Sequence, residues 1–165
     1  MKNKILIVNT GGTFNKYYDP ISGELKIDPK GNALQVLAEK WLTNFETLNM
    51  IGKDSLEMTN HDRLELLATL HQSQYQKIII VHGTDTMALS AEYIANAELE
   101  KQIVFTGAMV PFSIDPVEAS ANIASAFGYL LGSEKNGVFI AMHGIIATYD
   151  KVRKERQKGK FISAS

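Results

Sequence analysis

Short, continuously apolar runs recur along the chain and alternate with longer segments in which apolar residues follow a helical spacing. Four of these runs are rich in β-branched residues and begin at residues 4, 77, 102 and 137, with the sequences KILIV, KIIIV, QIVFT and GVFIAM. Short runs without polar alternation are typical of parallel strands that are covered on both faces. A weaker run, FETLNMI from Phe45, predicts a fifth strand.

Four segments between the runs are predicted to be helices, at about residues 32–42, 62–75, 86–97 and 116–131. In the second of them, the spacing places on one stripe Leu64, Leu67, Ala68, His71 and Tyr75. The last helix is rich in alanine and has a proline near its start, where proline is favoured. This alternation predicts an α/β fold with a single open, mostly parallel sheet and helices on both faces.

The composition of the chain mainly excludes certain classes of binding partner and of catalytic site. The 165 residues are 45% hydrophobic and have a net charge of -1, which predicts a single globular domain over residues 1–165. This charge gives no electrostatic basis for binding nucleic acid or an anionic membrane. Because cysteine is absent from the sequence, thiol catalysis, thiolate zinc sites and disulfides are excluded. The first apolar run ends at Val8, too short for a signal-peptide core, so we expect a cytoplasmic protein.

Ligands bind to open α/β sheets beyond the carboxyl ends of the strands, so the loops after the five runs are the segments of interest. In chain order they read NTGGTF, GKDSLEM, HGTDTM, TGAMVPF and HGIIATYDKVRK. Four of the five combine glycine with a nearby hydroxyl or acid. A phosphate site has only generic support, because neither G-x-G-x-x-G nor G-x-x-x-x-G-K-[ST] occurs.

The first and third loops allow a structural and a chemical interpretation. Structurally, the glycines of TGGT permit a sharp turn, Thr10 and Thr13 bond local backbone groups, and Asp85 caps the following helix. Chemically, hydroxyls at two strand ends, with Asp85 beside Thr84, suggest nucleophilic hydrolysis in which a basic group takes a hydroxyl proton. A lysine whose pKa is lowered by burial or by a nearby cation can be that base.

The histidines and the final basic run carry less information. No pair among His61, His71, His82 and His143 has the i, i+4 spacing of metal ligands, so we expect no metal site. His82 is expected to be a packed or hydrogen-bonded residue at a strand end. Residues 151–160, KVRKERQKGK, are predicted from composition to be a solvated tail or helix.

Taken together, the loops resemble the bacterial-type L-asparaginase family, which includes the asparaginase/glutaminases. The matching segments occur in family order: TGGTF from Thr10, YDPISGEL from Tyr18, DSLEM from Asp54, HGTDTM from His82, TGAMVP from Thr106, and GVFIAMHG followed by KVRK. TGGT and HGTDT together are highly specific. The resemblance covers the family's N-terminal domain, and we expect this fold without the smaller C-terminal domain that completes a neighbouring subunit's site.

The resemblance implies a role for each matching residue. Thr13 matches the nucleophile, and Tyr18 would assist it from a loop that closes over the substrate. Thr84, Asp85 and Lys154 match a polar cluster that handles protons, in which Asp85 also holds the α-ammonium group of the substrate. Two substrate contacts are also implied, to the carboxylate by Ser55 and near the side-chain amide by the backbone of Ala108.

The implied reaction is hydrolysis of L-asparagine, or of a related small side-chain amide, to the acid and ammonia through an acyl-enzyme on Thr13. No metal or organic cofactor is implied. The expected partner is a small amino-acid amide, with no nucleic acid or membrane, and the expected assembly is a homo-oligomer, with a dimer favoured. The alternative is a non-catalytic amino-acid-binding or regulatory module that retains the same pocket.

Overall fold

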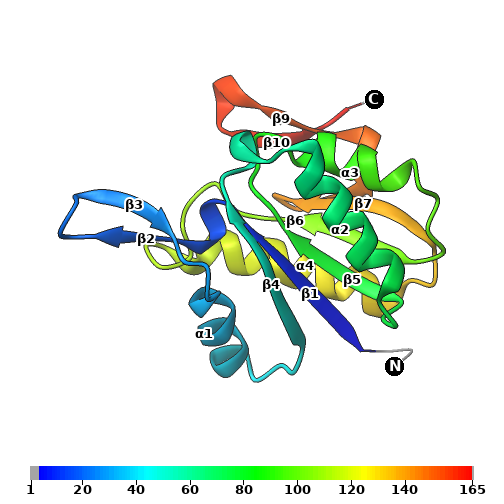
Figure 1. The fold of residues 1–165 in the computed structure, drawn as a ribbon, viewed down its shortest axis with the longest axis horizontal. Helices are drawn as coiled ribbons and strands as arrows, with labels where there is room; N and C mark the ends of the chain where they lie inside the picture. The colour runs from blue at the N-terminus through cyan, green and yellow to red at the C-terminus, as the bar shows by residue number, and fades with distance from the viewer. Residues whose placement is uncertain (1–3, 165) are drawn as a thin grey trace.

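The structure is a computed structural model that describes residues 4–164, and its central element is a six-stranded sheet (Figure 1). The strand order is β4-β1-β5-β6-β7-β8, with β8 antiparallel to β7 and all other neighbours parallel. The strands are β1 (Ile5–Gly11), β4 (Glu46–Lys53), β5 (Lys77–Val81), β6 (Gln102–Thr106), β7 (Gly137–Met142) and β8 (Ile145–Thr148). The predicted α/β class with one open, mostly parallel sheet is confirmed.

Helices cover both faces of this sheet. They are α1 (Asn32–Trp41), α2 (Asn60–Gln72), α3 (Met87–Ala95) and α4 (Pro116–Gly132). Successive strand residues point to opposite faces, so Ile7 of β1 packs in a core with α1 and α4, whereas Val8 packs in a second core with α2 and α3. Figure 1 shows α2 and α3 in front of the sheet and α4 behind it. Burial on both faces explains why the strand sequences do not alternate with polar residues.

The buried face of α2 differs from the predicted stripe. Its buried residues are Asp62, Arg63, Leu66 and Leu70, whereas Leu64 is exposed. Arg63 lies inward because its guanidinium group finds hydrogen-bond acceptors in neighbouring segments. The predicted stripe was wrong because a hydrophobic pattern cannot detect a charged residue that is buried together with its partners.

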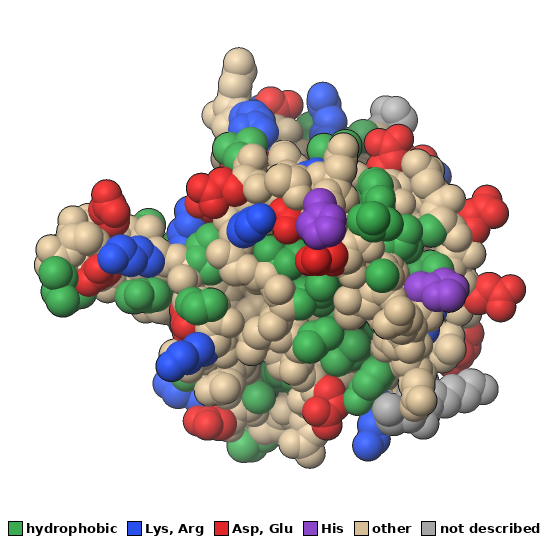
Figure 2. All heavy atoms as spheres, in the orientation of Figure 1, with side chains coloured by type: hydrophobic (Ala, Val, Ile, Leu, Met, Phe, Trp, Pro, Cys, Tyr) green, Lys and Arg blue, Asp and Glu red, His purple; other side chains and the backbone are tan. Residues whose placement is uncertain are grey.

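An antiparallel hairpin projects from the body of the protein. It consists of β2 (Lys16–Asp19) and β3 (Glu24–Ile27) and lies at the left of Figure 1. In Figure 2 it is a narrow projection that exposes both charged and hydrophobic side chains. The segment YDPISGEL, which resembles a flexible loop of the family, therefore forms most of a hairpin in this structure.

The basic run near the end of the chain is neither a tail nor a helix, which corrects the prediction. It forms a second hairpin of β9 (Val152–Glu155) and β10 (Lys160–Ser163). Val152 and Phe161 are buried in the core on the α2 and α3 face. The prediction was wrong because a count of charges does not register two well-separated apolar residues that dock a hairpin. Residues 4–164 also contain four 3-10 helices: η1 (Thr13–Asn15), η2 (Ser55–Glu57), η3 (Tyr149–Lys151) and η4 (Arg156–Lys158).

Two buried lysines close the edge of the sheet at the amino ends of the strands. Lys77 Nζ donates to the Leu130 carbonyl near the end of α4 at 2.5 Å. Lys101 Nζ donates to the carbonyls of Ser73 and Tyr75, just after α2, at 2.7 Å each. Ammonium groups at these positions donate to carbonyls left unpaired at helix ends. Their positive charge also interacts favourably with the negative end of the helix dipole. In the described part of the chain, no helix has the length and apolar character required to cross a membrane.

Candidate active site

The glycines of the first and third loops bring the two candidate hydroxyls to neighbouring positions. β1 and β5 are adjacent parallel strands, and each leads into a glycine followed by a threonine, Gly12 then Thr13 and Gly83 then Thr84. A Cβ built on Gly12 would lie only 2.5 Å from the Gly83 nitrogen. The two loops can therefore touch only if residue 12 is glycine. Thr13 and Thr84 are the residues that come directly after the two glycines in contact.

The two threonines of the first loop have different surroundings. Thr10 is fully buried, and its hydroxyl donates to the Val81 carbonyl at 2.7 Å. It therefore joins β1 to β5, which corrects the expected role in a local turn. Thr13 is the first residue of η1 and, unlike Thr10, is partly exposed.

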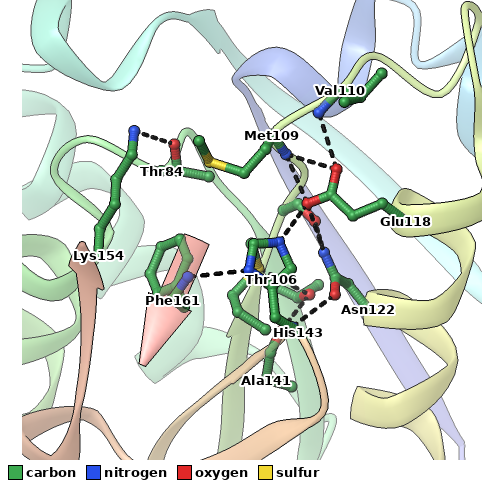
Figure 3. A network of polar contacts seen from close by, with 12 residues as sticks. Thr84, Thr106, Met109, Val110, Glu118, Asn122, Ala141, His143, Lys154 and Phe161 are labelled. Carbon is green, nitrogen blue, oxygen red and sulfur yellow. Dashed lines mark hydrogen bonds and ion pairs between the residues drawn. The ribbon is translucent and has the colours of Figure 1, made fainter. Parts of the chain in front are cut away.

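Lys154 joins the third loop to the second hairpin (Figure 3). Its Nζ donates to Thr84 Oγ1 at 2.8 Å and to Asp85 Oδ1 at 2.9 Å. Arg156, which the sequence analysis did not single out, adds a second cation with its Nη1 2.9 Å from the same Oδ1. The hydrogen bond from Lys154 lowers the pKa of Asp85, and the charge of Arg156 adds to this effect. The structure thus brings together Thr84, Asp85 and Lys154 around an ionised carboxylate.

The start of α3 is held by the second loop and not by Asp85. Thr86 is the N-cap residue of α3, and its N–H donates to Ser55 Oγ at 3.1 Å. The Thr86 hydroxyl donates to the Ser55 carbonyl at 2.9 Å. Ser55 also packs so closely on Gly83 that a Cβ at residue 83 would lie 2.8 Å from the Ser55 Cβ. The capping interpretation of Asp85 is therefore wrong, and Ser55 lies in close contact with the third loop.

The fourth loop is anchored by α4. The Glu118 carboxylate accepts hydrogen bonds from the backbone N–H groups of Met109 and Val110, at 2.9 Å each. Asn122, one turn further along α4, donates to the Gly107 carbonyl at 2.9 Å. Ala108 is buried between these anchored residues, so its backbone is held in a single place at the carboxyl edge of the sheet.

Tyr18 is the predicted site residue that the structure leaves apart from the others. It lies on β2 opposite Leu25 of β3, and 59% of its surface is exposed. The base of this hairpin is fixed, because Lys16 Nζ lies 3.0 Å from Asp54 Oδ1 in the second loop. Tyr18 is therefore presented to solvent on the projecting hairpin and is not enclosed by the residues around Thr84.

A buried polar network supports the third loop from within the protein. Arg63 Nε donates to Ser90 Oγ at 2.9 Å, and Nη2 donates to Thr86 Oγ1 at 3.3 Å. His82 Nε2 lies 2.8 Å from Ser90 Oγ, and its Nδ1 lies 2.6 Å from the Gly83 carbonyl. His82 is thus a hydrogen-bonded residue at a strand end, as predicted. Burial lowers its pKa to about 4, and the charge of Arg63 contributes, so the ring is neutral at pH 7.

A groove of about 950 Å³ lies elsewhere, between the base of the first hairpin, α1 and the start of α4. Lys16, Val36, Phe112 and Pro116 are among its lining residues, and none of the predicted site residues lines it. The candidate site is therefore identified by its hydrogen-bonded polar groups and not by the size of a hollow. Within residues 4–164, histidine, aspartate and glutamate side chains form no group of three or more that could hold a metal ion.

The relationship to known families agrees with these motifs. The family model described as "Asparaginase, N-terminal" matches residues 4–160, which is nearly the whole chain. The chain belongs to this family. The resemblance inferred from TGGTF, HGTDTM and the accompanying segments is therefore confirmed at the level of the asparaginase N-terminal domain.

Solved structures show the same fold as this asparaginase-family domain. The thermostable L-asparaginase from Thermococcus kodakarensis superposes with a TM-score of 0.81 at 22% identity, over 97% of this chain and 51% of that chain. A probable cytoplasmic L-asparaginase from Campylobacter jejuni gives a TM-score of 0.80 at 24% identity, over 98% of this chain and 53% of that chain. This chain thus spans about half the length of these two proteins.

Two curated proteins share a shorter stretch with this member of the asparaginase N-terminal family. The 60 kDa lysophospholipase of Mus musculus is 40% identical over 62 residues, which are 35% of this chain and 11% of that protein. The 60 kDa lysophospholipase of Homo sapiens is 39% identical over 62 residues. Both matches are local, and each covers 11% of the relative's length.

Proposed function

We propose that this chain carries an asparaginase-type amidohydrolase site, which cleaves the side-chain amide of L-asparagine or of a related small amide to the acid and ammonia. The observation that carries the proposal is the position of Lys154 Nζ, within hydrogen-bond distance of both Thr84 Oγ1 and Asp85 Oδ1. Hydroxyl nucleophiles require a neighbouring group that moves protons. A site that only binds an amino acid has no need of an ammonium group on a threonine hydroxyl.

In the proposed reaction, Thr13 Oγ attacks the carbonyl carbon of the amide and forms a tetrahedral intermediate. The hydroxyl proton passes to the leaving nitrogen, the C–N bond breaks, and ammonia leaves an acyl ester on Thr13. Water then adds to the ester, and a proton returns to Thr13 Oγ as the acid departs. Thr84 and Lys154 carry these protons, and the backbone at Ala108 binds near the amide.

The proposed substrate contacts follow from charge and position. The lowered pKa of Asp85 keeps its carboxylate ionised. Lys154 and Arg156 both contact Oδ1, so Oδ2 is the oxygen that would receive the α-ammonium group of an amino acid. The Ser55 hydroxyl, packed against Gly83, would donate to the substrate carboxylate. Both charged ends of an amino acid would thus be bound beside the two threonines.

The test is ammonia release from L-asparagine and L-glutamine by the purified protein and by Thr13→Ala and Thr84→Val variants. Turnover by the wild type that falls by roughly two orders of magnitude or more in either variant supports the proposal. A lysophospholipid is included as an ester substrate because two relatives bear that activity in their names. Ester cleavage without ammonia release would contradict the amide proposal.

The second candidate is a non-catalytic amino-acid-binding or regulatory module. The exposure of Tyr18 favours it, because the residue proposed to assist the nucleophile faces solvent in this structure. Titration calorimetry with L-asparagine and L-aspartate, using wild type and Asp85→Asn, distinguishes the two functions. Binding that requires Asp85, without turnover of any substrate, would support the module and contradict the enzyme.

A further inference from the structure

His143 occupies a turn position whose backbone does not call for histidine. His143 and Gly144 form the two-residue loop between β7 and β8, across which Met142 pairs with Ile145. Their φ angles are 53° and 81°. Two-residue hairpin turns with two positive φ angles favour asparagine, aspartate or glycine at the first position. The reason for histidine must therefore be sought in what its side chain contacts.

The His143 ring bridges two segments that are distant in the chain (Figure 3). Nδ1 accepts a hydrogen bond from the Phe161 N–H at 3.0 Å, and Nε2 lies 2.6 Å from Glu118 Oε2. Because a backbone N–H can only donate, Nδ1 must be the acceptor, and the ring proton lies on Nε2 and points at Glu118. The ring thus links α4 to β10 with one defined hydrogen-bond direction.

Each end of this bridge leads to a residue of the candidate active site. Glu118 also accepts the N–H groups of Met109 and Val110, which follow Ala108 in the fourth loop. Phe161 is the direct partner of Lys154 in the β9–β10 pairing. A continuous set of hydrogen bonds and one strand pair therefore connects the segment around Ala108 to the strand that carries the Lys154 ammonium group.

We infer that Glu118 and His143 are positioning residues, which hold the fourth loop and the Lys154-bearing hairpin in one fixed arrangement. The inference rests on the proposed function and gives Glu118 and His143 a role that the family resemblance does not assign. Neither side chain is placed on the reacting atoms. Their effect passes through the Met109 and Val110 backbone on one side and through Phe161 on the other, so their loss should displace Lys154 from Thr84.

The test uses two variants that preserve the local fold. His143→Asn keeps a residue that accepts positive φ, but its side chain is too short to span from Glu118 to Phe161. Glu118→Gln keeps the size of the side chain but replaces one acceptor oxygen with a donor. The matched controls are His71→Asn and Glu92→Gln, the same substitutions at exposed helix positions outside the network.

For each protein, kcat and KM for ammonia release, the thermal midpoint and the backbone amide NMR signals are measured. We expect kcat to fall roughly tenfold or more in both network variants while KM changes less than about threefold, because misplaced groups mainly affect the transition state. The thermal midpoint of His143→Asn should fall by a few degrees, roughly 2–4 °C for each kcal/mol of hydrogen bonding lost, so kcat is measured well below the midpoint of every variant. The double variant should lose little more than either single variant, because both act through one network.

Two results would overturn the inference. One is wild-type kcat in both network variants. The other is a fall in kcat that tracks the thermal midpoint or appears equally in the controls, which would indicate general destabilisation. If the wild-type protein cleaves no substrate, the proposed function fails but the inference is still tested by NMR. The inference then predicts that the amide signals of Thr84 and Lys154 are altered in His143→Asn and unaltered in His71→Asn. Unaltered signals in both variants would reject the inference.

Discussion

The ammonium group of Lys154 shows how backbone geometry selects one cation from a basic run. Residues 151–160 contain six lysines and arginines. The side chain of Lys154 is only 16% exposed, whereas that of the adjacent Arg153 is 64% exposed. Neighbouring strand residues point to opposite sides, so β9 turns Lys154 toward the third loop and Arg153 toward solvent.

The first prediction compares Lys154→Met with Lys158→Met. Both changes remove one ammonium group from the same hairpin, but Lys158 lies exposed on η4 and is not part of the candidate site. Lys154→Met should lower kcat for ammonia release about 100-fold or more, which is the usual contribution of a positioned proton-transfer group. Lys158→Met should leave kcat within about twofold. Equal effects at both positions would mean that only the overall charge of the hairpin matters.

At the level of elements, the candidate site depends on how closely the loops at the carboxyl edge of the sheet approach one another. Parallel strands end at the same edge, and here the backbones after β1 and β5 touch at Gly12 and Gly83, with Ser55 also packed against Gly83. Gly12 also has φ 75° and ψ -178°, a combination that is essentially restricted to glycine. The glycines are therefore required by the approach of the loops and by the backbone of residue 12.

The second prediction compares Gly12→Ala with Gly23→Ala. Both residues have positive φ, 75° and 73°, but a Cβ on Gly23 meets nothing within 4 Å. Gly23→Ala should lower the free energy of unfolding by about 1–2 kcal/mol, through the backbone alone. Gly12→Ala should cost about 2 kcal/mol more, because its Cβ also collides with the Gly83 backbone and alanine does not readily adopt the φ and ψ of residue 12. Urea denaturation measures both values, and equal losses would show that the loops separate without cost.

At the scale of the whole molecule, stability is linked to pH through the buried His82. The ring bonds Ser90 and the Gly83 carbonyl and lies near the Arg63 charge. Burial, with Arg63 contributing, lowers the pKa of His82 to about 4, compared with 6.5 for an unperturbed histidine. Between these values the unfolded chain binds a proton at this residue and the folded protein does not. Lowering the pH through this interval therefore favours unfolding.

The third prediction is a loss of up to about 3 kcal/mol in the free energy of unfolding between about pH 6.5 and pH 4, with no further loss from His82 below that range. In His82→Gln, the change in the free energy of unfolding over this pH range should be smaller by this amount, whatever the stability of the variant at pH 7. His61→Gln is the control, because the His61 side chain is 75% exposed. Urea denaturation at several pH values gives the slopes, and equal slopes for wild type and His82→Gln would contradict the assignment.

Local pattern was sufficient to predict the five parallel strands of the central sheet, the helix positions and the loops that carry the candidate chemistry, but not β8 or the two hairpins. The reason is that a parallel strand buried on both faces must be apolar throughout, as in residues 77–81. The α/β class then places the following loops at one edge, so Thr13, Ser55, Thr84 and Ala108 could be predicted to lie at the same edge of the sheet. These inferences require no knowledge of which distant residues meet.

The contacts that complete the site depend on residues far apart in the chain, and a linear pattern does not record them. Lys154 reaches Thr84 across 70 positions only because β9 pairs with β10 and the hairpin docks through Val152 and Phe161. Three other features also depend on distant parts of the chain: the burial of Arg63, the two hydrogen bonds of the His143 ring and the exposure of Tyr18. Each is decided by the packing of whole elements, because a polar side chain is stable inside a protein only where distant segments supply its partners.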